Sequence, residues 1–230
     1  MARRRGWYVA AVLLAVFAAG GCGDASPESA PTGVDQLVIP TPSPDPADFV
    51  AGIDNPWLPL TPGATWTYQV TGSPSGVENG TMTVTVRDQP QDVAGVSATV
   101  VDTSGPAGDF TDFYAQDRSG NVWWFGRDGV WRAGDEGAEA GLAMPRHPRL
   151  GDGWRKAYLP GVVEDQATVT STDDTVMVPA GTFEGLVELE TSSPLVPDLG
   201  YRETYARGIG LVSTLTVHGP TYLAELVSGP

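Results

Sequence analysis

The sequence predicts an all-β domain with one curved antiparallel sheet, preceded by a disordered tether. Apolar and polar residues alternate with a period of two through most of the chain after residue 49, and no segment there has a convincing helical pattern. Glycine, proline, aspartate or asparagine separates these segments, as is typical of strands joined by tight turns. Such a long sheet must hide its apolar face by curling into a barrel or half-barrel, or by pairing with a second sheet.

Residues 1–21 are a predicted signal peptide. Three arginines at positions 3–5 are followed by an apolar run over residues 7–19 and then by two glycines. The apolar run is shorter than the about 20 residues that a membrane-spanning helix needs. We therefore expect export and cleavage rather than a retained transmembrane helix.

The segment Ala19-Gly20-Gly21-Cys22 resembles the lipobox of bacterial lipoproteins, although alanine stands where leucine is usual. The resemblance implies that Cys22 is acylated and that the chain is cut in front of it. Cys22 is the sole cysteine, so it has no partner for an internal disulfide. Several acyl chains on one residue anchor a protein firmly, whereas one chain is marginal. We expect a lipid anchor at the extracytoplasmic face of the membrane; the alternative is ordinary secretion with a free thiol.

The exported part of the chain is strongly acidic. Removing residues 1–21 deletes three arginines and no acid, which leaves ten basic against 28 acidic side chains, a balance of −18. Nucleic acids bind through lysine and arginine, so we exclude them as partners. An anionic membrane surface also repels such a chain, and the acyl group must therefore hold it there.

Residues 22–48 form the predicted tether. This stretch is rich in proline, serine, alanine and aspartate, has no aromatic residue, and contains one short apolar run over residues 37–39, so it cannot build a core. Proline occupies every second position over residues 40–46, which favours an extended polyproline II conformation. The tether therefore lifts the following domain away from the bilayer.

Residues 49–230 form a single predicted domain of antiparallel strands. Alternation is clearest over residues 65–70 and 81–86. Further strands are expected over residues 97–103, 111–116, 122–125, 167–172, 186–191, 201–207, 211–218 and 222–227. The gaps at residues 118–121 and 219–220 are short enough to predict hairpins. Neighbours in sequence should therefore pair antiparallel.

Several segments resemble an uncharacterised family of bacterial lipoproteins. They are residues 53–68 (IDNPWLPLTPGATWTY), residues 112–117 (DFYAQD) with 120–126 (GNVWWFG), and residues 178–183 (VPAGTF) with 205–212 (YARGIGLV). The family has no established activity, so the resemblance implies only a fold and a place in the cell envelope. The last pair is also similar to envelope proteins whose curved sheets resemble lipoprotein-localisation carriers, in which a half-barrel holds acyl chains. That similarity implies a lipid-binding hypothesis at the level of fold.

No residue pattern assigns a catalytic, metal or cofactor site. The histidines, His147 and His218, have no second zinc ligand nearby, and no Gly-x-Ser-x-Gly elbow occurs. Four oxygen-bearing residues are spaced as in a calcium loop: Asp117, Ser119, Asn121 and Asp128. The glycine lies at the wrong position for such a loop. We therefore interpret residues 117–121 as a hairpin turn, where glycine and asparagine accept positive φ.

Trp123 and Trp124 are the candidate ligand-binding residues. Neighbouring residues of a strand point to opposite faces, so one indole is available to a ligand if protein covers only one face. We predict a non-enzymatic envelope domain that binds a lipid, another apolar ligand or an envelope protein. The alternative is a carbohydrate-active domain that binds or hydrolyses cell-wall glycan with paired carboxylates and exposed tryptophans.

Overall fold

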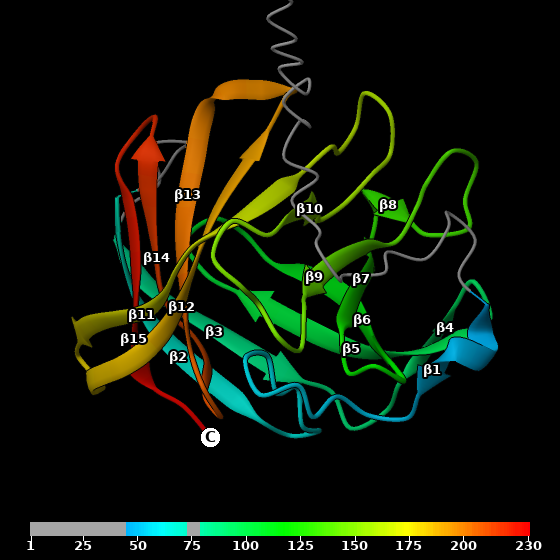
Figure 1. The fold of residues 1–230 in the computed structure, drawn as a ribbon, viewed down its shortest axis with the longest axis horizontal. Helices are drawn as coiled ribbons and strands as arrows, with labels where there is room; N and C mark the ends of the chain where they lie inside the picture. Colours follow the sequence, from blue (N-terminus) through cyan, green and yellow to red (C-terminus); the bar gives the residue numbers. More distant parts are fainter. Residues whose placement is uncertain (1–44, 73–78) are drawn as a thin grey trace, which may run out of the picture. The chain divides into compact units, whose positions relative to one another are not determined.

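The computed structural model describes residues 45–72 and 79–230, and their strands pair into one antiparallel sheet that does not close into a barrel (Figure 1). This confirms the predicted all-β class with a curved sheet. A 3-10 turn, η1, covers Pro46–Asp48. No helix in the described ranges is long and apolar enough to cross a membrane. The predicted signal peptide, Cys22 and most of the predicted tether lie outside the described residues.

The first part of the sheet contains β1 (Phe49–Val50), β2 (Thr65–Gly72), β3 (Gly80–Val86), β4 (Gln91–Val93), β5 (Val96–Ser104), β6 (Phe110–Asp117), β7 (Val122–Arg127), β8 (Trp131–Arg132) and β9 (Gly141–Met144). The second part contains β10 (Gly153–Arg155), β11 (Gln166–Val178), β12 (Gly181–Ser193), β13 (Val196–Ala206), β14 (Gly210–His218) and β15 (Tyr222–Ser228). All ten predicted strands are present. The five short strands β1, β4, β8, β9 and β10 were not predicted.

Two meanders make the sheet. One runs through β2, β3, β5, β6 and β7, and the other runs from β10 to β15. They join where β15 pairs antiparallel with β2, with Ala224 opposite Val70. The path ends at β8 and β10, and the segments that follow these two strands make an isolated antiparallel bridge between Glu139 and Tyr158. The sheet therefore bends around a concave face that the strands themselves leave open.

The segment that begins with residues 53–57 is held by Asn55, which is fully buried. Its Nδ2 donates to the Gly120 carbonyl at 2.8 Å, and its Oδ1 accepts from the backbone N–H of Trp57 at 2.8 Å. Gly208 donates its backbone N–H to the Pro56 carbonyl at 2.7 Å. One asparagine thus ties this segment to the β6–β7 turn, and the next residues of the segment reach the concave face.

The β6–β7 connection is a hairpin turn organised by the Asp117 carboxylate. Asp117 accepts hydrogen bonds from the backbone N–H groups of Ser119 and Asn121 and from the Asn121 side chain, at 2.8–3.0 Å. Gly120 has φ +85°, where a side chain would be strained. The carboxylate is surrounded by donors rather than by other oxygen ligands. This arrangement matches the turn chemistry that the sequence predicts.

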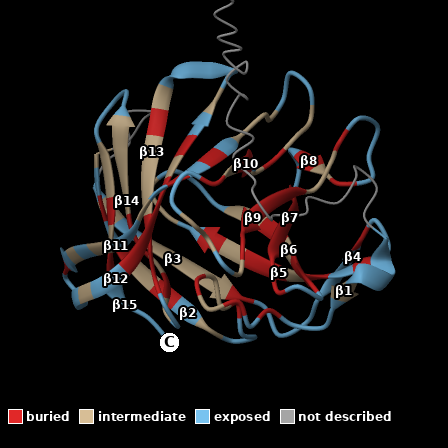
Figure 2. Cartoon of the chain, viewed as in Figure 1, coloured by how far each residue is buried: buried red, intermediate tan, exposed pale blue. Residues whose placement is uncertain are grey.

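Burial is uneven around the sheet (Figure 2). Buried side chains gather on β5, β6, β7 and β9, whereas β13 and β14 carry many half-buried residues. On the outer face of β7, Phe125 is fully buried, and the Phe49 ring packs edge-on against it with centroids 5.0 Å apart. Protein therefore covers the outer face here, and part of the concave face is left without packing partners.

Candidate functional site

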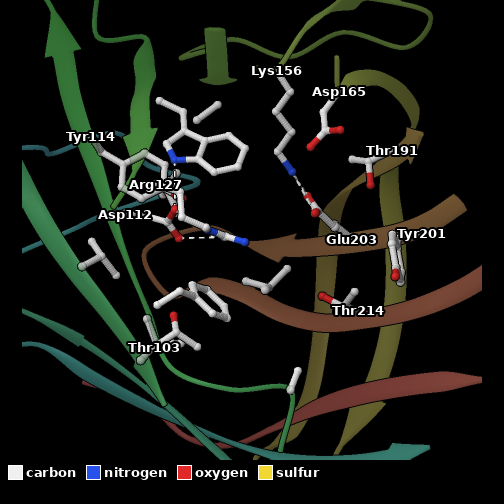
Figure 3. A pocket seen from close by; sticks show the side chains of 18 of the residues that line it. Thr103, Asp112, Tyr114, Arg127, Lys156, Asp165, Thr191, Tyr201, Glu203 and Thr214 are labelled. Atoms are coloured by element: carbon white, nitrogen blue, oxygen red, sulfur yellow. Dashed lines mark hydrogen bonds and ion pairs between the residues drawn. The ribbon is translucent and has the colours of Figure 1, made fainter. Parts of the chain in front are cut away.

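The concave face surrounds a cavity of about 620 Å³ (Figure 3). Its lining comes from both halves of the sheet: β2, β3, β5, β6, β7 and β9 on one side, and β12, β13, β14 and β15 on the other. Three large apolar residues of the lining are exposed, Val162, Leu195 and Val196. The cavity therefore opens to solvent beside these residues.

One wall of the cavity is apolar, and strand alternation explains it. Trp66 and Tyr68 of β2 face inward, together with Met82 and Val84 of β3, while intervening threonines face away. The Trp66 indole donates to the Ile209 carbonyl at 2.8 Å. The Tyr68 hydroxyl likewise donates to a backbone carbonyl of β14 at 2.9 Å. The polar atoms of both aromatics are thus satisfied by backbone. Both side chains are only 3% exposed, so the half-buried Met82 and Val84 provide the accessible apolar surface of this wall.

An Asp112–Arg127 ion pair forms part of the opposite wall. Nε and Nη2 of Arg127 donate to the two carboxylate oxygens at 2.8 and 2.9 Å, and the Trp124 indole donates to Asp112 Oδ1 at 3.1 Å. The guanidinium carbon lies 4.0 Å from the centroid of the Phe110 ring. Burial lowers the pKa of Arg127, but the hydrogen bonds and charge of Asp112 outweigh it, and the net pKa shift is upward. The pair is a fixed, neutralised unit.

A β-bulge places Trp124 and Arg127 on the same face. In the β6–β7 ladder, Phe113 pairs with Gly126 and Tyr114 pairs with Trp124, so Phe125 is the additional residue. Strict alternation would send residues 124 and 127 to opposite faces. The bulge therefore brings the arginine into the cavity next to the tryptophan.

A second charged pair, Lys156 and Glu203, comes from the other half of the chain (Figure 3). The ammonium of Lys156 lies 2.8 and 2.5 Å from the two oxygens of Glu203, and the Tyr205 hydroxyl donates to the same carboxylate at 2.7 Å. Burial, and then the charge of Glu203, raise the pKa of Tyr205 well above its ordinary value. This hydroxyl therefore stays protonated and remains a donor.

Asp165 is the third carboxylate of the lining, beside Lys156. Burial raises the pKa of Asp165, and the charge of Lys156 offsets this only in part. The cavity therefore favours the protonated form of Asp165 more than water does. Its backbone carbonyl also accepts from the Lys156 N–H at 2.7 Å, which fixes this loop against the end of β10.

The structure places the two predicted tryptophans in different environments. Trp124 lines the cavity. Trp123 lies on the opposite face of β7, only 2% exposed, with its indole N–H donated to Asp117 at 2.9 Å. Sequence reasoning missed Arg127, Lys156 and Glu203, because no local pattern relates residues so far apart in the chain.

The remaining sequence candidates lie away from the cavity. His147 and His218 are exposed and absent from its lining. In residues 45–72 and 79–230, no three histidine, cysteine, aspartate or glutamate side chains are grouped to hold a metal ion. The described site is thus an apolar cavity with two internal ion pairs and one further carboxylate.

Comparison with known proteins gives structural likenesses only. No protein-family model and no curated protein matches the chain. A Bacteroides fragilis structure, titled a putative exported protein with a YmcC-like fold, is 16% identical with a TM-score of 0.41, over 76% of this chain and 98% of that one. A Parabacteroides distasonis structure, titled a putative lipoprotein, is 15% identical with a TM-score of 0.40, over 77% of this chain and all of that one. Neither likeness assigns an activity.

Proposed function

We propose that this chain is an exported lipoprotein, anchored through Cys22 at the extracytoplasmic membrane face, whose β domain binds an apolar chain in the concave cavity. The observation that carries the proposal is the cavity itself. Its volume of about 620 Å³ lies within the range of roughly 300–1,000 Å³ that ligand pockets have. Most of its lining side chains are apolar or aromatic, as in ligand pockets generally.

A binding role rather than a catalytic one is supported by the state of the charged groups. Asp112 is held by Arg127 and by the Trp124 indole, and Glu203 is held by Lys156 and Tyr205. A general acid or base must be able to reach and exchange a proton with its substrate. These two carboxylates have their oxygens committed to fixed donors, which suits positioning and packing.

A glycan-active domain is the second candidate. Asp165 favours it, because its raised pKa is the property that a general acid in glycoside hydrolysis requires. Asp165→Asn would then abolish hydrolysis of cell-wall fragments. If the wild type hydrolyses these fragments and the Asp165→Asn variant does not, the domain is a glycan hydrolase and the binding proposal is wrong.

The binding proposal is tested on the mature chain from residue 22 with Cys22→Ser, which removes the anchor. Purified from a host with a bacterial envelope, it should carry bound lipid detectable by native mass spectrometry, and delipidation should shift its tryptophan fluorescence. Because only Trp124 of the two adjacent indoles lines the cavity, Trp124→Phe should reduce this shift and Trp123→Phe should leave it. A lipid-free protein that also fails to take up added apolar probes would refute the proposal.

The anchor is tested separately with the full chain. Wild-type protein should partition with membranes and incorporate labelled palmitate, whereas Cys22→Ser should do neither. Incorporation of label by the serine variant would show that the anchor lies elsewhere.

A further inference from the structure

The cavity contains an unusual set of charges for an apolar binding site. Five ionisable side chains other than tyrosines occur in its lining, three carboxylates and two cations, so the fully ionised wall has a net charge of −1. They are Asp112, Asp165, Glu203, Arg127 and Lys156. Both cations are already in contact with a carboxylate.

An anionic head group is disfavoured at this wall. At the free Nη1 of Arg127 it would meet a guanidinium whose charge Asp112 already neutralises, and to reach Lys156 it would have to displace Glu203. That displacement leaves a mostly buried carboxylate unpaired, which is costly. Like charges brought together at such a site also oppose binding.

The wall still offers hydrogen-bond donors to an uncharged group. Asp112 engages Nε and Nη2 of Arg127, which leaves Nη1 directed into the cavity without an acceptor among the described residues (Figure 3). Hydroxyls of Thr103, Thr191 and Thr214 also line the space. These groups suit the carbonyl and hydroxyl oxygens of an ester or a polyol.

The volume matches a ligand with one chain. If a water-sized group occupies ~30 Å³, a cavity of about 620 Å³ takes on the order of 20 non-hydrogen atoms. One fatty acyl chain with a small head group has this size.

Resting on the proposed function, we propose that the ligand is an uncharged rather than anionic single-chain amphiphile: an acyl chain along Met82, Val84 and Tyr222, with an ester or hydroxyl head against Arg127. The paired carboxylates and the net charge of the wall act against anionic heads. Free fatty acids, which share the chain, are thereby excluded at neutral pH.

The test compares two probes of equal chain length on the mature Cys22→Ser chain at pH 7.5: 1-monopalmitoylglycerol and palmitate. Each displaces a bound uncharged fluorescent probe. The glyceride should bind at least ten-fold more tightly than palmitate. Palmitate binding as tightly as the glyceride would overturn the inference while the binding function stands. Failure of the uncharged probe itself to bind would instead remove the proposed function.

A charge-changing variant gives an independent readout. Asp165→Asn with Glu203→Gln turns the wall from −1 to +1 and frees Lys156. Palmitate affinity should then rise at least ten-fold, and glyceride affinity should change less. The control, Asp173→Asn with Glu184→Gln, makes the same charge change at exposed residues away from the cavity. An equal palmitate gain in the control, or no gain in a folded double variant, would also overturn the inference.

Discussion

Narrowing the cavity from β3 should shorten the chain that it accepts. Val84 lines the apolar wall and is half-buried, so Val84→Phe adds about four carbon atoms to the space that an acyl chain would use. Each buried methylene contributes roughly 0.8 kcal/mol, which is about a four-fold change in Kd. In the wild type, affinity should rise by this factor per methylene until the cavity of about 620 Å³ is full.

The expected loss follows from these values. About four displaced methylenes at roughly 0.8 kcal/mol each cost about 3 kcal/mol, or on the order of 100-fold in Kd, for a chain that fills the wild-type cavity. Shorter chains should lose little. The break in a plot of affinity against chain length should therefore move to shorter chains by about four carbons.

The assay is titration of monoacylglycerols of increasing chain length, followed by displacement of an apolar fluorescent probe. Val227→Phe is the matched control, because Val227 is 42% exposed on β15 and does not line the cavity. An unchanged break in Val84→Phe, with the protein still folded, would show that the chain does not lie along this wall. An equal shift in the control would point to a general effect on the sheet.

Three further outcomes follow from particular contacts. Asp117→Ala removes the acceptor of four N–H groups, three of them from buried residues. It should lower the free energy of unfolding, measured by urea titration, by about 3–5 kcal/mol. A loss below about 1 kcal/mol would contradict the assigned turn. Burial raises the pKa of Asp165 above its value of about 3.9 in the unfolded chain, so the ionised carboxylate destabilises the fold above the raised pKa and has no such effect below about 3.9. Asp165→Asn should therefore raise Tm at pH 7 but not at about pH 3.5. An equal rise in Tm at both pH values would refute this pH dependence. A Cβ at Gly141 would lie 2.3 Å from the Lys156 carbonyl. Gly141→Ala should therefore lower the free energy of unfolding by about 1–3 kcal/mol in the same urea titration. An unchanged free energy of unfolding would show that β9 and residue 156 can move apart without cost.

Much of the fold is predictable because the alternation of apolar and polar residues within each short segment indicates a strand. Alternation over residues 65–70 and 81–86 defines which side chains share a face, and the structure places Trp66, Tyr68, Met82 and Val84 together. The turn at residues 117–121 was predicted for the same reason, since glycine and asparagine act on their own backbone. The short strands β8 and β9 escaped prediction because two to four residues are too few for a period.

The stretch over residues 136–144 shows the limit of local patterns. Its sequence predicts neither a helix nor a strand, yet Gly141–Met144 forms β9 and pairs with β7. Gly141 is explained by a contact that the local sequence does not show, because the backbone at Lys156 approaches too closely for a Cβ. Tertiary packing therefore decides the structure of this stretch.

By itself, the sequence determined the β class, the ten longer strands and the rule that Trp123 and Trp124 face opposite ways. Only the tertiary structure decided which indole reaches the cavity, because that depends on which face of β7 the rest of the chain covers. It also decided that Lys156 meets Glu203 and that a bulge turns Arg127 inward toward them. The physical reason is that the pairing of β15 with β2 joins the two meanders and bends them around one space, and no local periodicity encodes that contact.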